Sequence, residues 1–515
     1  TVSASHAKTF AYLPLIDLLK GYFELSPRDD ERKRREKVTG KVLTLDRSLE
    51  DTLPYLFPLL GVTEPDPALQ QMDPRVRRER TFAALKRLLV RESLNQPLVL
   101  IVEDLHWLDA ETQAFLNLFG ESIASARVLL LVDYRPEYRH SWGGKTYYTQ
   151  LRLDPFGERE AEELLTALLA EKVGGQPTAS FQPLKRLILA KAQGNPFFIE
   201  EIIQELCEQG VLAGTEGESG LNPSPAATSL TDLHIPTTVH AILASRIDRL
   251  PPEEKDLLQT LAVVGKEFPV RLLTHVTGRS ADTLQTLLSR LRAAEFLYEQ
   301  PVFPEPTYAF KHALTQEVAY TSLLIERRKA LHERTAGAIE ELCQQHLEEC
   351  YGELAYHYTR GGNAEKAVEF LRRAGQQATR RSAYGEAVGH LTTALELLRA
   401  LPDKSDRAQR ELPLQLAFAA ALQATKGPAA PEVERAYTRA RALCQREQDA
   451  PQLFSALRGL WVLHHVRAEL TTAREIGEQL LGMAEQLQDP ALLLEAHRAL
   501  GSTLLWQGEF SRART

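Results

Sequence analysis

The sequence predicts a mostly α-helical protein with a small α/β core near its start and helical-hairpin repeats at its end. Two short apolar runs, residues 98–102 and 128–132, have the length of buried strands, and a helical pattern over residues 110–124 separates them. Strand, helix, strand with fully apolar strands is typical of a buried parallel sheet. After residue 326, small and apolar residues recur at roughly 34 to 40 residues, which predicts stacked helical hairpins of the tetratricopeptide type.

Length and composition narrow the class of protein. A chain of 515 residues is too long for one hydrophobic core, so several domains are expected. Its net charge of −8 and pI near 6.0 argue against bulk nucleic-acid binding and against attachment to an anionic membrane. No apolar run is long enough to span a bilayer.

The cysteines are few and scattered. Cys207, Cys343, Cys350 and Cys444 form no close Cys-x-x-Cys pair, so we expect neither a disulfide framework nor a zinc site. A reducing compartment, and therefore a cytoplasmic location, fits this pattern. The chain opens at Thr1 and stops at Thr515 inside a helical pattern, so both ends are expected to be cut.

Between the core and the repeats, the sequence predicts further helical segments. Helices are expected over residues 158–172, 181–193 and 197–209, and a Gly-, Ser-, Pro- and Thr-rich stretch at 213–231 predicts a linker. Residues 235–324 predict three short helices and a strand pair at 296–298 and 308–310, which is the winged-helix pattern. Earlier, helices are expected at 10–23 and 78–92, and the mixed-charge run 28–37 predicts a solvated loop or helix face.

The motif most suggestive of chemistry follows the first apolar run. Glu103 and Asp104 end the strand, and His106, Trp107 and Asp109 come directly after them. A parallel strand delivers such acids to its carboxyl end, where ligands bind in α/β folds. One carboxylate there can hold Mg²⁺ and the next can orient an attacking water. The alternative is a strand that simply ends in solvated acids.

With these motifs, the chain from Tyr12-Leu-Pro14 to its end resembles the signal-transduction ATPases with numerous domains, which are AAA-like P-loop NTPases. It is most similar to bacterial predicted ATPases fused to class III adenylate/guanylate cyclases and followed by tetratricopeptide repeats, an architecture that soluble adenylyl cyclases share. The resemblance implies five segments. They are a partial NTPase core with a parallel sheet at 1–155, a helical lid at 156–212, a linker at 213–234, a winged-helix-like domain at 235–325, and an all-α repeat solenoid at 326–515.

The resemblance assigns roles to three residues of the core. Glu103 and Asp104 stand at the Walker B acids, which hold Mg²⁺, although the family usually has Asp first, so which acid contacts the metal stays open. The strand 128–132 followed by Asp133-Tyr-Arg135 resembles the sensor-1 strand, whose arginine reads the γ-phosphate of ATP. The alternative for Arg135 is a surface salt bridge.

Two further residues are assigned outside the core. Gly194-Asn-Pro196 resembles the lid's Gly-x-Pro motif, in which the proline packs by the adenine, although the same pattern marks an ordinary helix boundary. His312, after Phe310-Lys311, resembles the histidine that contacts the β-phosphate of ADP in related switches. The alternative is a histidine with a structural role.

The phosphate-binding loop is the missing motif. Such a loop needs Gly-x-x-x-x-Gly-Lys-[Ser/Thr] at the start of a helix. The near match Gly143-Gly144-Lys145-Thr146 has Arg139 where the first glycine belongs, so it is expected to be an unrelated loop. The family places the true loop before the residue 10–23 helix, so it is expected upstream of Thr1, and this fragment alone should bind ATP weakly or not at all.

Together these features imply a switch that uses ATP, ADP and Mg²⁺ and whose repeats bind a protein or peptide partner. ATP would open a closed ADP-bound form, with output on a domain outside this chain, a nucleotide cyclase by resemblance, and with homo-oligomerisation on activation left open. Direct nucleic-acid binding is not expected, because basic and acidic residues nearly balance over 235–320. The alternatives are a non-catalytic repeat scaffold with a decayed ATPase core, and a transcription regulator of the maltose-activator type.

Overall fold

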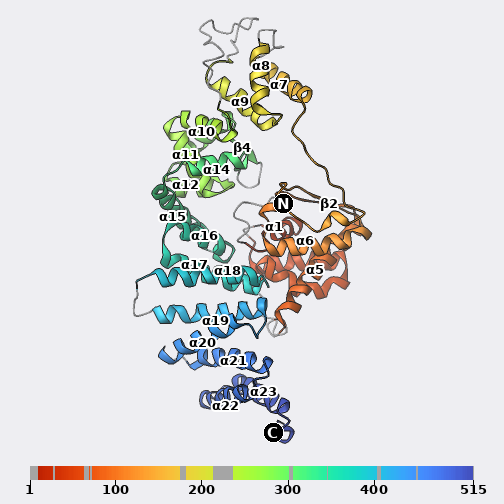
Figure 1. Ribbon diagram of the computed structural model, residues 1–515, viewed down its shortest axis with the longest axis vertical. Coiled ribbons are helices and arrows are strands. Elements are labelled where there is room, and N and C mark those ends of the chain that lie inside the picture. The colour runs from red at the N-terminus through yellow and green to blue at the C-terminus, as the bar shows by residue number, and fades with distance from the viewer. Residues whose placement is uncertain are drawn as a thin grey trace. The chain divides into compact units, whose positions relative to one another are not determined.

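The computed structural model describes residues 10–26, 29–62, 69, 72–173, 181–212, 236–300, 306–344, 346–402, 407–447 and 450–513. The chain divides into two compact units, which are described separately. The first comprises Thr1–Tyr148 and Ile339–Thr515, and the second comprises Thr149–Ala338. Helices dominate both units, a small parallel sheet lies in the first, and stacked helices form a solenoid, which confirms the mostly α prediction (Figure 1).

The start of the first unit is a helical layer beside a two-stranded sheet. Its elements are α1 (Leu13–Tyr22), α2 (Glu31–Leu45), η2 (Arg47–Thr52), α3 (Leu53–Leu56), η3 (Phe57–Leu60), α5 (Pro74–Asn95), β1 (Leu98–Val102), η4 (Leu105–Trp107), α6 (Ala110–Ser122), η5 (Ile123–Ser125), β2 (Val128–Val132) and η6 (Trp142–Gly144). Tyr12, Phe82, Phe115 and Phe119 are buried and contact one another in a chain of rings with centroids 5.6–6.2 Å apart. These rings join α1, α5 and α6.

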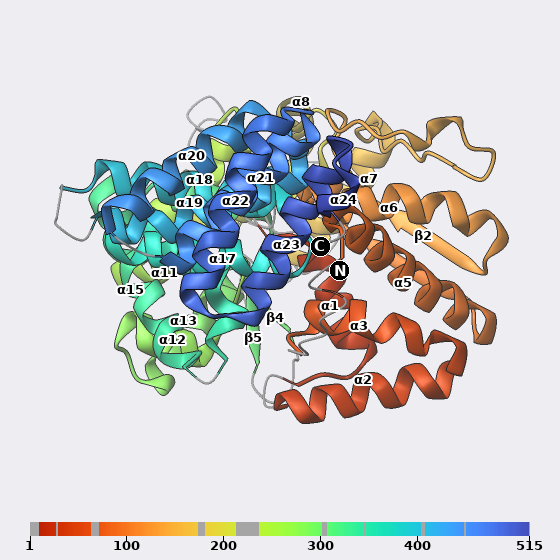
Figure 2. The same ribbon diagram turned by 90° about the horizontal axis from the view of Figure 1, so that it is seen from below.

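Strands β1 and β2 pair in parallel, with Val102 opposite Val132. The prediction that both strands are fully buried is wrong for one face of this sheet. Val99, Ile101, Leu129 and Leu131 are 61%, 45%, 60% and 50% exposed, and the register pairs Val99 with Leu129 and Ile101 with Leu131. Strand periodicity puts alternate residues on opposite faces, and α5 and α6 lie beside β2 in both views (Figures 1 and 2). A layer over the other face is not present in the described part of the chain.

The repeat region of the first unit is a series of helices, each packed on its neighbours in sequence. They are η8 (Leu347–Cys350), α16 (Tyr351–Gly361), α17 (Ala364–Arg380), α18 (Tyr384–Ala400), α19 (Arg407–Lys426), α20 (Pro431–Glu447), α21 (Ala450–Val466), α22 (Leu470–Leu487), α23 (Pro490–Trp506) and α24 (Phe510–Ala513). In Figure 1, α17 to α23 follow one another in chain order, coloured cyan to blue. Small residues allow close contact: a Cβ at Gly459 would lie 2.3 Å from the Tyr437 ring.

The second unit is helical with a small antiparallel sheet. Its elements are α7 (Glu158–Val173), α8 (Gln182–Ala192), α9 (Pro196–Glu208), α10 (Val239–Arg249), α11 (Pro252–Val264), β3 (Glu267–Pro269), α12 (Val270–Thr277), α13 (Ala281–Ala293), β4 (Leu297–Gln300), β5 (Thr307–Phe310) and α14 (Ala313–Thr321). Helix α15 (Ile325–Leu342) continues from it into the first unit. The strand order is β3-β5-β4.

The prediction of three short helices over 235–324 is wrong in number, because five helices, α10 to α14, and an extra strand, β3, lie there. These helices are 8 to 13 residues long, and Pro251-Pro252 or Gly278 separates successive ones, so a helical period has few turns in which to show itself. The predicted linker at 213–234 lies outside the described residues.

A buried arginine ties the second unit together. The guanidinium of Arg246 on α10 donates to Glu201 and Glu208 of α9 and, at 2.7 Å, to the carbonyl of Ala294. Its side chain is 1% exposed, and its Cζ lies 4.6 Å from the centre of the Phe296 ring. Two carboxylates compensate a charge that would otherwise be very costly to bury, so α9 is fixed to α10 and to the residues that lead into β4.

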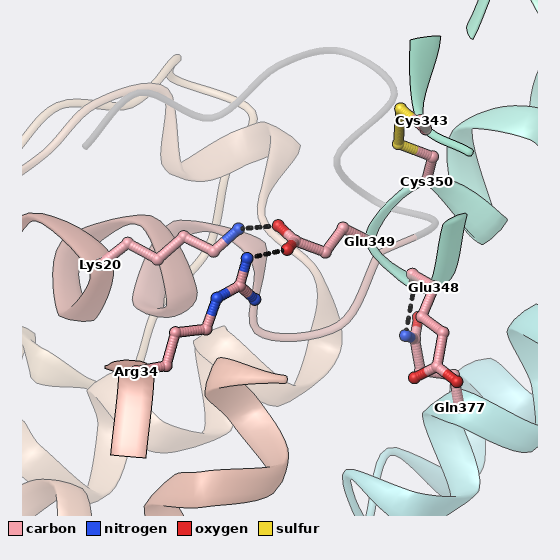
Figure 3. The surroundings of a disulfide bond; sticks show 7 residues. All are labelled: Lys20, Arg34, Cys343, Glu348, Glu349, Cys350 and Gln377. Atoms are coloured by element: carbon pink, nitrogen blue, oxygen red, sulfur yellow. Dashed lines mark hydrogen bonds and ion pairs between the residues drawn. A yellow bond between two sulfur atoms is a disulfide. The ribbon is translucent and has the colours of Figure 1, made fainter. Parts of the chain in front are cut away.

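The expectation that the cysteines form no disulfide is wrong for one pair. Cys343, just after α15, is bonded to Cys350 at the end of η8 (Figure 3). A spacing of seven residues matches no standard cysteine motif, so no pattern in the sequence predicts this bond. Cys207 is partly buried and Cys444 is buried, and both are free thiols.

Removing this disulfide should destabilise the first unit by about 2 kcal/mol, because the bond closes a short loop in the unfolded chain. All four tryptophans (Trp107, Trp142, Trp461 and Trp506) belong to the first unit, so their fluorescence during urea unfolding isolates its transition. The Cys343→Ser/Cys350→Ser variant should unfold at lower urea and lose its response to dithiothreitol. Cys207→Ser is the matched control and should keep that response, and identical wild-type midpoints with and without dithiothreitol would contradict the prediction.

Candidate functional site

The sequence-predicted core residues gather at one edge of the parallel sheet. Because β1 and β2 run in the same direction with Val102 opposite Val132, the chain leaves both strands at the same edge. Glu103 and Asp104 follow β1 directly, and Arg135 lies three residues beyond β2. The two acids are half-buried, whereas Arg135 is exposed.

Backbone hydrogen bonds fix the turn that carries the acids. The N–H of Asp104 donates to the Asp133 carboxylate at 2.8 Å, and the N–H of Leu105 donates to the Asp133 carbonyl at 3.0 Å. Asp104 has φ 57° and ψ 49°, a left-handed conformation that is uncommon for residues other than glycine. Asp133 thus stabilises a turn that would be unfavourable alone. Sequence reasoning noted Asp133 only as a neighbour of Arg135 and missed this role.

Arg135 contacts an aromatic ring. Its Cζ lies 5.6 Å from the centre of the Trp107 ring, which is the distance of a cation–π interaction. The ring of His106 lies 4.7 Å from that of Trp107, and His106 Nε2 is 3.9 Å from the Asp104 carboxylate. Thus the carboxylate of Asp104 and the guanidinium of Arg135 flank the same His-Trp pair.

Asp109, the last acid of the motif, has a structural role. It is 3% exposed and caps α6, accepting hydrogen bonds from the N–H groups of Glu111 at 3.0 Å and Thr112 at 2.8 Å. Its carboxylate also accepts from the Tyr12 N–H at 3.1 Å and from the Thr112 hydroxyl at 2.6 Å. Burial raises the pKa of Asp109, and these donors oppose that shift. Asp109 therefore belongs to the motif as the cap of α6.

A metal ion at this edge would need further ligands besides the carboxylates of Glu103 and Asp104. In the described part of the chain, His, Cys, Asp and Glu form no group of three or more that could hold a metal ion. Mg²⁺ is commonly held by one or two carboxylates together with phosphate oxygens and water. Glu103 and Asp104 fit that kind of partial site.

The glycine-lysine sequence at 143–146 does not open a helix. Residues Trp142–Gly144 form a 3₁₀ turn, Thr146 lies in a turn, and the next helix begins at Glu158. The ammonium of Lys145 lies 3.9 Å from the Glu121 carboxylate. This loop therefore lacks the helix N-terminus on which phosphate binding depends.

In the second unit, Gly194-Asn195-Pro196 separates α8 from α9. Gly194 has φ 77°, and a Cβ there would lie 2.2 Å from the carbonyl oxygen of Phe156. Asn195 caps α9 by accepting from the Phe198 N–H at 3.1 Å, and Pro196 occupies the first helical turn. An ordinary helix boundary therefore explains why Gly194, Asn195 and Pro196 occur here. Pro196 is exposed.

The second unit brings the Pro196 segment and His312 together. The ring of Phe197 stacks on the ring of His312, with centroids 4.1 Å apart and planes inclined by 13°. His312 caps α14, because its Nδ1 accepts from the Leu314 N–H at 3.0 Å. This cap needs an unprotonated Nδ1, so the neutral ring carries its proton on Nε2. Pro196 and His312 therefore belong to one group, and Glu103, Asp104 and Arg135 to another on the first unit.

A carboxylate with two lysines lies next to His312, and sequence reasoning missed it. Glu295 accepts hydrogen bonds from Lys172 at 2.7 Å and from Lys311 at 2.8 Å. Burial alone would raise the pKa of Glu295, but the two lysines outweigh burial and lower it to about 2. Glu200 on α9 lies 3.7 Å from Lys311. These groups join α7, α9 and the hairpin that leads to His312.

Within the first unit, the helical layer contacts the beginning of the repeats through charged side chains. Lys20 on α1 donates to Glu349 at 2.8 Å, and Arg34 on α2 donates to the same carboxylate, next to the disulfide (Figure 3). Arg77 on α5 donates to the Ser382 hydroxyl and the Thr379 carbonyl, both at 2.8 Å. The partners lie about 300 residues apart in sequence, so no local pattern could have revealed them.

Comparisons with known proteins gave matches of low sequence identity. No protein-family model matches it. It is 26% identical over 450 residues to an uncharacterized protein, R02095, of Rhizobium meliloti (strain 1021), covering 86% of this chain and 41% of that protein. The chain therefore spans less than half the length of this relative.

Two solved structures share low similarity with the chain. One is PH0952 from Pyrococcus horikoshii, a signal transduction ATPase with numerous domains and a tetratricopeptide repeat sensor. Its sequence identity is 14% and its TM-score 0.41, covering 99% of this chain and 71% of that one. The other is BtubC (BKLC) from P. vanneervenii, with 16% identity and a TM-score of 0.29, covering 37% of this chain and 77% of that one.

Glu295 should make the second unit sensitive to acid. Its folded pKa lies below the usual value of 4.5, so its stabilising contribution is present above pH 4.5 and is lost as the pH falls toward 2. Because Glu295 is partly exposed, we expect less than about 1 kcal/mol. Hydrogen exchange of β4 and α7 amides, measured across this range, should show declining protection in the wild type and a flatter profile in Glu295→Gln. Parallel profiles for the two proteins would contradict the assignment, and Glu299→Gln is a matched control nearby.

Proposed function

We propose that this chain is the nucleotide-responsive and repeat-bearing part of an ATP-dependent signalling switch. In this proposal, Glu103 and Asp104 hold Mg²⁺ and orient water, and Arg135 contacts the γ-phosphate of ATP. Pro196 packs by the adenine and His312 contacts the β-phosphate of ADP, while the repeats bind a protein or peptide partner. Nucleotides would act by binding one conformation more tightly than the other.

The observation that carries the proposal is the edge of the β1–β2 sheet. Two adjacent carboxylates and an arginine emerge there, and the turn at Asp104 is held in an unfavourable backbone conformation by Asp133. Local strain of this kind is concentrated at ligand-binding and catalytic sites. The open apolar face of the same strands supports a core that is completed by a further layer of polypeptide.

The second group of residues, Pro196 and His312, suits a contact with the nucleotide that differs between ATP and ADP. Pro196 is exposed, and the stacked Phe197–His312 pair lies directly beside it. The neutral His312 ring would present an Nε2–H donor to a phosphate oxygen. Lys311, adjacent in sequence, is held by Glu295 at 2.8 Å.

The contact between the helical layer and the first repeats offers an element that a switch can break and remake. It depends on Glu349, Arg77 and their polar partners, of which Lys20 is partly exposed whereas Arg34 and Ser382 are buried. Partly exposed ion pairs such as Lys20–Glu349 contribute little free energy each, so a difference in nucleotide affinity between two conformations can shift such a contact. Glu349 is one acceptor for two cations, so losing it would release both.

In this proposal, ATP hydrolysis belongs to a protein longer than this chain, which spans 41% of the length of R02095. The output domain that we propose is a fused nucleotide cyclase. The proposal assigns no oligomeric state to the activated protein. If the full-length protein neither binds nor hydrolyses ATP, the repeat scaffold with a decayed core becomes the better account. A basic helix-turn-helix beyond the repeats would instead favour the transcription regulator.

In the full-length protein, Asp104→Asn and Glu103→Gln should each lower ATP turnover by about a hundredfold or more. The acid that contacts the metal should also show weaker Mg²⁺-dependent ATP binding, whereas the acid that orients water should not. Turnover by steady-state phosphate release and binding by calorimetry separate the two roles. Asp109→Asn is the contrasting variant, and it should lower stability more than turnover. Unchanged turnover in both acid variants would overturn the proposed site.

His312→Asn should speed ADP release by about tenfold, because it removes the ring that we propose to contact the β-phosphate of ADP. Asparagine can keep the α14 cap, although the stacking on Phe197 is lost. Release of a fluorescent ADP analogue from the full-length protein gives the rate. His240→Asn, on an exposed position of α10, is the matched control. Equal release rates for wild type and His312→Asn, with folding retained, would leave His312 as a structural cap only.

A further inference from the structure

A pocket of ≈ 780 Å³ lies along α18, α19 and α20 within the repeats of the first unit. Each helix contributes residues spaced three or four apart, so one face of each helix lines it. Its basic lining residues are Arg399, Arg407, Lys426, Arg435, Arg439 and Arg446. A cavity of this size is in the range of specific ligand sites.

The lining has an excess of positive charge. It contains six basic side chains and two carboxylates, in a chain whose net charge is −8. Arg439 pairs with Glu411 through two hydrogen bonds of 2.8 Å, and Lys426 pairs with Glu432 at 2.6 Å. Arg439 and Lys426 thus match the two carboxylates, and Arg399, Arg435 and Arg446 add further positive charge to the lining. A lining with this excess of positive charge would attract an anionic ligand.

The floor of the pocket is apolar. Leu422 and Leu443 are buried, and Phe418 is only partly buried although it is aromatic. A floor of this kind accepts apolar side chains, whereas arginines around it suit bidentate contacts with carboxylates. This combination fits a ligand that carries both carboxylates and apolar side chains.

We propose that this groove binds an acidic peptide segment of a partner protein, with aspartate or glutamate on the arginines and an aliphatic or aromatic side chain on the floor. The inference deepens the partner-binding part of the proposed function and rests on it. Along α19, the lining from Arg407 to Lys426 is about 28 Å long, which an extended peptide of about eight residues would fill. Nucleic acid fits less well, because the apolar floor offers nothing to a sugar-phosphate backbone.

The test uses the whole chain, without nucleotide, and a fluorescein-labelled peptide of about eight residues that alternates Asp or Glu with Leu or Phe. Anisotropy should show saturable binding that weakens as salt rises, and the same peptide with Asn and Gln in place of its acids should bind at least about tenfold more weakly. Because ATP is absent, a failed nucleotide switch would leave this result unchanged, and absence of peptide binding would leave the ATP assays unaffected.

Variants on one helix provide matched controls. Arg435→Gln and Arg446→Gln should each weaken peptide binding by about tenfold, whereas Arg441→Gln, on α20 but outside the lining, should not. Tryptophan-detected unfolding should show unchanged or slightly higher stability for the groove variants, because each removes a repelling charge. Loss of stability together with binding would indicate a structural role instead.

Several outcomes would overturn the proposal. They are no saturable peptide binding, equal binding by Arg435→Gln and Arg441→Gln, or tighter binding of a short oligouridylate than of the peptide at the same salt. The last result would assign the groove to nucleic acid. Competition by inorganic tripolyphosphate as strong as that by unlabelled peptide would likewise assign it to small polyanions.

Discussion

The parallel pairing of β1 with β2 is the constraint on which the candidate site depends. It makes both strands end at one edge, and the backbone hydrogen bonds continue past the strands to Asp133 and Leu105. These bonds hold the Asp104 turn, and they lead the chain into the short helix that carries Trp107, above which Arg135 lies. An antiparallel pairing would have sent Arg135 to the opposite edge of the sheet, far from the acids. The chemistry that we propose therefore follows from strand direction before it follows from any side chain.

The same sheet shows why a strand pair is a weak structure alone. Its four exposed apolar side chains form two directly paired rows, and apolar area removed from water is worth roughly 25 cal/mol per Å². Covering this face would therefore stabilise the sheet and fix the edge that carries the acids. The repeats have the opposite property, since each helix already buries its apolar face on its neighbours in sequence.

The second unit relies on buried charge where the first relies on aromatic packing. Arg246 reaches two carboxylates of α9 and the carbonyl of Ala294, and Glu295 then binds Lys172 and Lys311. Removing one partner of a buried pair is far more costly than the pair is stabilising, so the Arg246 contacts resist partial opening. In the switch that we propose, the lid helix and the hairpin before His312 would consequently move as one body.

The sequence by itself determined the mostly helical architecture, the two strands, most of the lid and repeat helices, and the order of the motifs, because apolar periodicity and helix caps are local properties. It also singled out Glu103, Asp104, Arg135, Pro196 and His312, whose chemical roles remain proposals. Only the tertiary structure decided which of these residues lie together, that one sheet face is open, and that Asp109 is a cap. The tertiary structure alone showed the Cys343–Cys350 bond, the burial of Arg246 and the arginine-rich groove in the repeats. The physical reason is that pairing, burial and charge balance depend on partners distant in sequence, whereas periodicity records only a residue's near neighbours.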